Sequence, residues 1–153
     1  SVMIGVKTAL NDNPKLNTRF WEGKNPIAIV IDPKEKLLNV KANFHLDRSK
    51  IITVKKTNPN KNNDNYLLSA KEILDQLYVQ NIQSVIIEGG SMTLQCFINT
   101  NLWDEAKIFI TNHKLSAGLE APKIQRDSIY SSSKIKDDML ITIYQESTMS
   151  NSV

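Results

Sequence analysis

The sequence predicts an α/β fold built on a mostly parallel sheet. Short continuous apolar runs, typical of strands covered on both faces, alternate along the chain with segments of helical periodicity. This alternation indicates β-α-β units, whose right-handed crossovers place ligand-binding residues at the carboxyl ends of the strands. With 153 residues, the chain fits one domain and leaves little room for two.

The expected strands are apolar and rich in β-branched residues. They cover residues 2–6, 27–31, 51–54, 85–87, 106–111 and 139–145. Asn11 to Pro14 is expected to form a loop, because Asn and Asp favour turns and Pro14 disfavours helix at Asn13. Residues 56–65 are expected to be a solvated loop, and residues 115–133 show no clear pattern.

Two helices are expected. Ser69 and Glu72 have the spacing of a capping box, which predicts a helix from Ser69 to Asn81. Its expected apolar face consists of Ala70, Ile73, Leu74, Leu77 and Tyr78. A second helix is expected over residues 92–100, with Leu94, Phe97 and Ile98 directed inward.

Composition excludes several classes of function. The net charge of +3 is too small and too scattered to indicate a nucleic-acid surface. A single cysteine, Cys96, and two distant histidines, His45 and His113, form no metal-ligand pattern. No apolar run has the length of a membrane span, and the first residues lack a signal-peptide pattern. We therefore expect a cytoplasmic protein without a metal, a nucleic-acid partner or a membrane partner.

The strongest local signal is the segment Glu88-Gly89-Gly90-Ser91, where a strand is expected to turn into a helix. Glycines let the backbone take positive φ and let a ligand approach its N–H groups. The start of a helix favours phosphate. A Gly-Gly pair also fits a tight turn with nothing bound, and Glu88 fits either a substrate contact or an exposed loop acid.

A second cluster of polar residues follows the first expected strand, in a segment expected to be a loop over residues 5–19. Thr8 offers a hydroxyl, Asp12 an acceptor and Arg19 a fork of donors suited to phosphate. Local features alone favour a turn role for Asp12 and a solvated surface position for Arg19 over ligand contacts. Asp32, after the second strand, can be a ligand contact or a turn cap.

Other reactive residue types have simpler interpretations. Cys96 is expected to be a small core residue rather than a nucleophile, since no histidine is near it in sequence. His45 and His113 are expected to be structural or exposed. Asp104 and Glu105, after Trp103, are expected to cap or position the connection between a helix and a strand.

Taken in order, four segments resemble a known family. They are residues 5–19 with Asp12-Asn13-Pro14, residues 25–32, Glu88-Gly89-Gly90, and residues 102–105 with Trp103-Asp104-Glu105. This set resembles the C-terminal reductase domain of the bifunctional riboflavin-biosynthesis deaminase–reductase, which is related to dihydrofolate reductase. The resemblance covers residues 1 to about 145. It implies a three-layer α/β/α fold and an incomplete reductase domain over residues 1–153, with the family's first strand and the deaminase domain lying upstream of Ser1.

The resemblance implies NADPH-dependent reduction of 5-amino-6-(5-phosphoribosylamino)uracil to the ribitylamino phosphate. Cofactor contacts are carried over to Thr8, Asp12, Gly89, Gly90, Ser91, Met92, Thr93, Leu94, Gln95 and Cys96. Substrate contacts are carried over to Leu16, Arg19 and Glu88. No proton donor is assigned. The chain departs from the family pattern at Asn13, Pro33 and His113-Lys114.

Recognition of a 2′-phosphate requires a basic residue near the adenosine ribose, for which Lys55 and Lys56 are candidates. The family resemblance also implies a homodimer. Two alternatives remain at this point. One is another reductase of the dihydrofolate-reductase type, acting on a pteridine or pyrimidine. The other is a truncated, non-catalytic dimerisation module.

Overall fold

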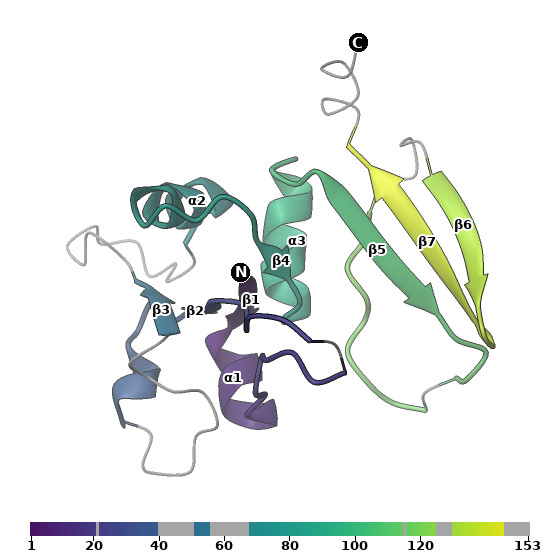
Figure 1. Ribbon diagram of the computed structural model, residues 1–153, viewed down its shortest axis with the longest axis horizontal. Coiled ribbons are helices and arrows are strands. Elements are labelled where there is room, and N and C mark those ends of the chain that lie inside the picture. The colour runs from purple at the N-terminus through teal and green to yellow at the C-terminus, as the bar shows by residue number, and fades with distance from the viewer. Residues whose placement is uncertain (21, 40–50, 56–67, 115, 125–129, 146–153) are drawn as a thin grey trace. The chain divides into compact units, whose positions relative to one another are not determined.

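The computed structural model describes residues 1–20, 22–39, 51–55, 68–114, 116–124 and 130–145 (Figure 1). The chain divides into two compact units, Ser1–Cys96 and Phe97–Val153. Each unit contains one sheet. The strands of the first unit are parallel, and those of the second are antiparallel.

The sheet of the first unit has the strand order β3-β2-β1-β4. Its strands are β1 (Val2–Gly5), β2 (Ala28–Ile31), β3 (Ile51–Val54) and β4 (Ile86–Ile87). All three pairings are parallel, and Gly5, Ile31 and Val54 share one register row. The carboxyl ends of β1, β2 and β3 are therefore level. The four expected strands and their parallel arrangement are confirmed, and no strand end differs from its expected position by more than one residue.

Two helices of the first unit cover opposite faces of this sheet, as Figure 1 shows for α1 (Val6–Asp12) and α2 (Ala70–Val79). The connection from β1 through α1 to β2 and the connection from β3 through α2 to β4 run in opposite directions across the sheet. Right-handed crossovers then place the two helices on opposite sides. The expected α/β/α layering is confirmed within this unit.

Each layer buries its own apolar residues. On the α1 side, Ile4, Ala28 and Val30 form a cluster with Ala9 and Leu37. On the other side of the sheet, Met3, Ile29 and Val54 are fully buried. The alternation of these two sets along the strands agrees with the period of two in a β-strand.

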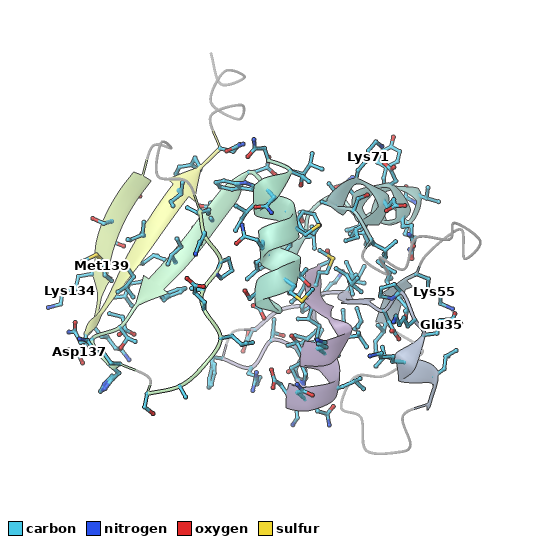
Figure 2. The ribbon with its side chains drawn as sticks, turned by 180° about the vertical axis from the view of Figure 1, so that it is seen from behind. Glu35, Lys55, Lys71, Lys134, Asp137 and Met139 are labelled. Carbon is cyan, nitrogen blue, oxygen red and sulfur yellow. The ribbon has the colours of Figure 1, made fainter. Side chains whose placement is uncertain are left out.

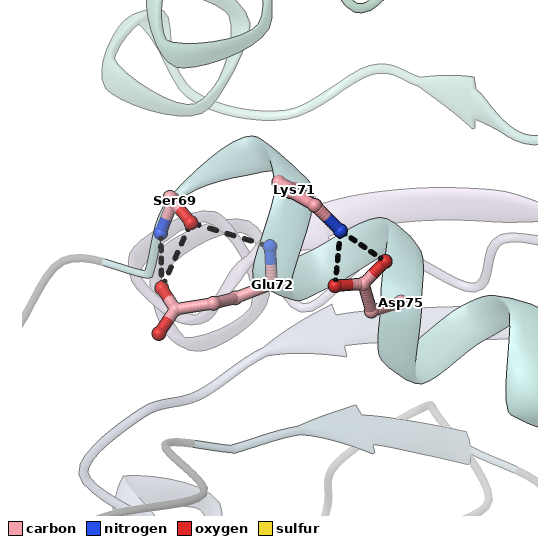
Figure 3. Close-up of polar contacts among 4 residues, drawn as sticks. All are labelled: Ser69, Lys71, Glu72 and Asp75. Carbon is pink, nitrogen blue, oxygen red and sulfur yellow. Dashed lines mark hydrogen bonds and ion pairs between the residues drawn. The ribbon is translucent and has the colours of Figure 1, made fainter.

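The helix α2 begins at the expected capping box (Figure 3). Ser69 Oγ accepts a hydrogen bond of 3.2 Å from the N–H of Glu72, whose carboxylate accepts one of 2.9 Å from the N–H of Ser69. Ala70, Ile73 and Leu77 are buried, as expected. The expectation for Tyr78 is wrong: its side chain is 82% exposed. Tyr78 lies about 100° around the helix from Leu77, which turns it away from the sheet.

The segment after β1 corrects the expectation of a loop, since Val6–Asp12 is the helix α1. Propensity alone does not favour so short a helix. Its fully buried Ala9 packs in the core cluster with Ile4 and Val30. The helix ends at Asn13, which adopts the left-handed conformation (φ 42°) and donates its N–H to the Ala9 carbonyl over 3.2 Å. Pro14 follows, as the sequence predicts for a helix-breaking position.

Asp32 lies at the end of β2 and is fully buried. Its Oδ1 accepts a hydrogen bond of 3.0 Å from the N–H of Lys36, and its Oδ2 accepts one of 2.8 Å from the N–H of Leu37. These bonds hold the short 3₁₀ helix η1 (Lys36–Asn39) against the sheet. Of the two interpretations that the sequence left open for Asp32, the structure supports the turn cap.

The second unit contains β5 (Glu105–Ile110), β6 (Tyr130–Ile135) and β7 (Asp138–Tyr144) in the order β5-β7-β6. The strands β5 and β7 lie within a residue or two of their expected bounds. The serine-rich β6 was not expected, because its sequence has no apolar alternation. It is held by pairing with β7 across a tight turn in which Ile135 faces Asp138 and Lys136 has a positive φ of 55°.

Replacing Asp32 with Asn is expected to destabilise the protein by about 1–3 kcal/mol, because an amide accepts only one of the two backbone hydrogen bonds and turns a donor toward the other. Urea unfolding of the full natural protein measures the difference. The matched control is Asp75→Asn, which removes only the exposed ion pair between Lys71 and Asp75 (Figure 3). Equal effects of the two substitutions would contradict the capping role.

Candidate active site

The strand β4 turns into the helix α3 (Ser91–Asn99) through Gly89 and Gly90. Gly89 is buried against β1: a Cβ at Gly89 would lie 2.6 Å from Ile4 Cβ and 2.8 Å from Ile4 Cα. Because Ile4 Cα belongs to the backbone, no side-chain rotation relieves that contact. A hydrogen bond of 3.0 Å from the N–H of Glu88 to the Met3 carbonyl continues the pairing of β4 with β1 up to this point.

Gly90 has a φ of +74°, which reverses the chain into α3. The two glycines therefore have different roles, close approach at Gly89 and positive φ at Gly90. The carbonyl of Gly90 accepts the first helical hydrogen bond, 3.1 Å from the N–H of Leu94. The N–H groups of the preceding turn point out of the helix end, where the helix dipole is positive.

Two threonine hydroxyls meet at this corner. A Cβ at Gly90 would lie 3.5 Å from Thr8 Oγ1 and 3.9 Å from Thr93 Oγ1, and a Cβ at Gly5 would lie 3.1 Å from Thr93 Oγ1. Thr8 comes from α1 and Thr93 from α3, so the ends of adjacent parallel strands bring together residues 85 positions apart in the sequence. The exposed glycine backbone and the two hydroxyls that flank it form a polar corner, where a Cβ at Gly90 would contact both hydroxyls.

The helical conformation of residues 6–12 determines how Thr8 and Asp12 lie relative to each other. Four residues apart in a helix, they lie on the same face of α1, while Ala9 points into the core. Asp12 is exposed, and Thr8 is half-buried at the corner. The structure thus aligns two residues that sequence reasoning had placed in an irregular loop.

The segment after α1 carries Leu16 and Arg19. Leu16, with a positive φ of 45°, packs against the core cluster and fixes the start of the loop. Asn25 Oδ1 accepts hydrogen bonds from the Thr18 N–H at 3.1 Å and from Thr18 Oγ1 at 2.9 Å, which close the loop. The adjacent Arg19 side chain is exposed. The guanidinium is thus presented to solvent by a loop anchored at both ends.

The remaining expected contacts lie along β4 and α3. Glu88 is exposed at the end of the sheet, one residue before the glycines. Met92 is exposed, whereas Ser91, Leu94, Gln95 and Cys96 are half-buried. Cys96 Sγ lies 3.8 Å from the Leu68 carbonyl, which agrees with its expected packing role.

In the second unit, the acids after Trp103 serve the start of β5. The carbonyl of Asp104 accepts a hydrogen bond of 3.0 Å from the N–H of Gln145, beyond the end of β7. Glu105 pairs with Lys107 at 2.7 Å. This hydrogen bond lowers the pKa of the Glu105 carboxyl and raises the pKa of Lys107. The contact of Asp104 is made by its backbone and that of Glu105 stays within β5, so the expected role of the two carboxylates in the connection before the strand stays a prediction.

Within the described ranges, no group of three or more His, Cys, Asp or Glu residues could hold a metal ion. The helices among these residues are all too short or too polar to cross a membrane. His113 is exposed, and its N–H donates to Thr111 Oγ1. His45 and Lys56 lie outside the described residues.

Known proteins share both the fold and the sequence pattern. The riboflavin biosynthesis protein RibD of Aquifex aeolicus is 29% identical over 147 residues, covering 89% of this chain and 41% of that protein. The 2,5-diamino-6-ribosylamino-4(3H)-pyrimidinone 5′-phosphate reductase of the same organism is 25% identical over 126 residues, covering 70% of this chain and 54% of that protein. The chain thus spans about half the length of these curated relatives.

A crystal structure from Thermotoga maritima has the same fold, with a TM-score of 0.71 and 22% identity over 94% of this chain and 44% of that one. It is described as a diaminohydroxyphosphoribosylaminopyrimidine deaminase/5-amino-6-(5-phosphoribosylamino)uracil reductase. The sheet order and these structural neighbours define an α/β fold of the dihydrofolate-reductase type. The family model described as the RibD C-terminal domain matches residues 1–115, and the chain belongs to that family.

Replacing Gly89 with Ala is expected to destabilise the first unit by about 1–3 kcal/mol, because the new methyl group must displace the β1 backbone at Ile4. Thermal and urea unfolding of the full natural protein measure the effect. The control is Gly118→Ala, where a Cβ meets nothing within 4 Å. If Gly89→Ala unfolds like the wild type, the close approach of β4 to β1 is refuted.

Proposed function

We propose that this chain acts as the reductase domain of a riboflavin-biosynthesis enzyme. The reaction is the NADPH-dependent reduction of 5-amino-6-(5-phosphoribosylamino)uracil to the ribitylamino phosphate. The observation that carries the proposal is the polar corner at Gly90, where the hydroxyls of Thr8 and Thr93 flank the glycine at the start of α3. Membership in the RibD C-terminal domain family supports the same reaction.

The polar corner at Gly90 suits the pyrophosphate of a dinucleotide. Phosphate oxygens accept hydrogen bonds from backbone N–H groups and hydroxyls, and the positive end of the α3 dipole favours their charge. The N–H of Leu94 is bonded to the Gly90 carbonyl, so the donors that we assign to phosphate are the N–H groups of Met92 and Thr93, with the hydroxyls of Thr8 and Thr93. We assign the wider run Gly89 to Cys96, with Thr8 and Asp12, to the cofactor site, where Leu94, Gln95 and Cys96 support the first turn.

The substrate is proposed to lie between Glu88 and the loop that carries Arg19. The Arg19 guanidinium can bind a phosphate with two parallel hydrogen bonds, and its exposure leaves it accessible. Glu88 can accept hydrogen bonds from sugar hydroxyls or amines, and Leu16 holds the loop in place. A phosphorylated sugar fits this charge pattern better than a folate does, which favours the pyrimidine substrate over a pteridine.

NADPH, when bound, supplies the hydride, and the task of the protein is to orient the two reactants. The corner fixes the phosphates, and Arg19 with Glu88 fixes the substrate, so the reacting carbon is held near the nicotinamide. Holding the two reactants in this orientation can increase the rate of hydride transfer greatly. We assign no side chain as the proton donor.

The assay is oxidation of NADPH by the full natural protein with the phosphorylated substrate. Arg19→Ala is expected to raise the KM for this substrate by about 10- to 100-fold, because a charge-assisted hydrogen-bond pair to phosphate is lost. Lys15→Ala, an exposed cation of the same loop, is the control. With the dephosphorylated substrate the difference between Arg19→Ala and the wild type should disappear.

NADPH should also raise the melting temperature of the full natural protein by mass action. An unchanged melting temperature together with intact turnover in Arg19→Ala would refute the assigned site. A dimer that binds no NADPH would instead support a non-catalytic dimerisation module.

We further propose that the chain pairs with a second copy through the sheet of the second unit. Ile108 and Ile110 of β5 face Ile141 and Met139 of β7 on one side of this sheet. Ile110 and Met139 are each 48% exposed, and clustered apolar exposure of this kind is typical of an interface.

Ile110→Lys is expected to shift sedimentation of the full natural protein from dimer toward monomer, because it buries a charge in the interface. The matched control is Phe109→Lys, which changes the neighbouring exposed residue on the opposite face of β5. A monomeric wild type, or equal effects of the two substitutions, would refute this interface.

A further inference from the structure

The carboxyl edge of the first sheet continues past the glycine corner to Lys55. Gly5, Ile31 and Val54 share one register row, and Lys55 follows Val54. Lys55 therefore lies on the same edge of the sheet as the corner between β4 and β1. It is separated from the end of β1 by two strand spacings, about 10 Å. A dinucleotide held by its pyrophosphate at that corner can extend its adenosine along this edge toward β2 and β3.

The backbone of Lys55 is fixed by hydrogen bonds to Gln76. Its N–H donates to Gln76 Oε1 over 3.2 Å, and its carbonyl accepts from Gln76 Nε2 over 2.8 Å. The amide of Gln76, on α2, thus satisfies both backbone groups of the residue that follows the edge strand β3. The position of Lys55 at the rim is therefore fixed by α2 and does not depend on its ammonium group.

The ammonium of Lys55 pairs with the carboxylate of Glu35 (Figure 2). Glu35 has a positive φ of 52°, and its N–H donates to the Asp32 carbonyl over 3.1 Å, in the turn that the buried Asp32 organises. Both partners are about half-exposed, at 50% and 46%. An ion pair this exposed contributes little to stability, so both groups are accessible to a ligand at small cost.

We propose that Lys55 binds the 2′-phosphate of NADPH and that Glu35 is its exchangeable counter-ion in the free protein. This inference rests on the proposed function, because it assumes a dinucleotide at the glycine corner. A phosphate dianion carries more charge than a carboxylate and displaces Glu35 from the ammonium. NADH, which has a ribose hydroxyl at that position, does not compete for Lys55. The pair Lys55–Glu35 thereby determines the preference for NADPH over NADH.

The experiment measures the dissociation constants of NADPH and NADH for the full natural protein by fluorescence titration. Lys55→Ala is expected to weaken NADPH binding by about ten-fold while changing NADH binding by less than about two-fold, because only the bond to the 2′-phosphate is lost. Lys55→Arg retains the charge and should retain the preference. Glu35→Gln should tighten NADPH binding by about two- to five-fold, since a like charge near the phosphate is removed.

Lys71→Ala is the matched control, because Lys71 forms a comparable exposed ion pair with Asp75 on α2. It should change neither dissociation constant. The wild-type preference for NADPH should also decline with added salt, as a surface charge contact is screened.

Three outcomes would overturn the assignment. Equal weakening of both nucleotides by Lys55→Ala would show a structural role, and unchanged binding would show that Lys55 does not contact the cofactor. Loss of the preference in Lys34→Ala or Lys36→Ala, with Lys55→Ala unaffected, would move the contact to the η1 turn. If the wild type binds neither nucleotide, the proposed function itself fails. If the wild type binds both nucleotides and only the results for the Lys55 variants differ from those expected, the role of Lys55 is refuted and the proposed function stands.

Discussion

The contact between Gly89 and Ile4 is the constraint on which the rest of the site depends. It brings the end of β4 against the backbone of β1, so closely that a Cβ has no place. The chain can then reverse at Gly90 only through positive φ, and α3 begins beside α1. Thr8 and Thr93 meet because these two helices start from neighbouring strands. Without that approach, the same residues would lie at separate turns and would not flank one glycine.

Parallel pairing explains why residues distant in sequence form one rim. The carboxyl ends of β1, β2 and β3 are level, so the groups that follow them lie along a single edge of the sheet. Asp32 is used internally to hold the η1 turn, whereas Glu35 and Lys55 are left accessible. The small net charge of the chain does not indicate this arrangement. Recognition of an anion depends on where a cation lies on the surface rather than on the total charge of the chain.

The two units bury their apolar residues differently. The first is covered by helices on both faces of a parallel sheet, which its continuous apolar runs require. The second is an antiparallel sheet of order β5-β7-β6, whose strands β5 and β7 carry exposed isoleucine and methionine side chains on one face. The serine-rich β6 completes this sheet by pairing with β7. The division suits a domain in which the first unit carries the proposed ligand site and the second carries the proposed contact with another copy.

The sequence by itself determined the four parallel strands, the capping box at Ser69 and the strand-to-helix corner at Gly89-Gly90, because local apolar pattern and cap chemistry decide these features. It did not reveal the helix α1, whose seven residues fold only because Ala9 is buried in the core, or β6, which depends on pairing with β7. Only the tertiary structure separated the roles of the two glycines, assigned Asp32 to a cap and joined Glu35 to Lys55. Each of these depends on contacts between segments, which no local pattern encodes.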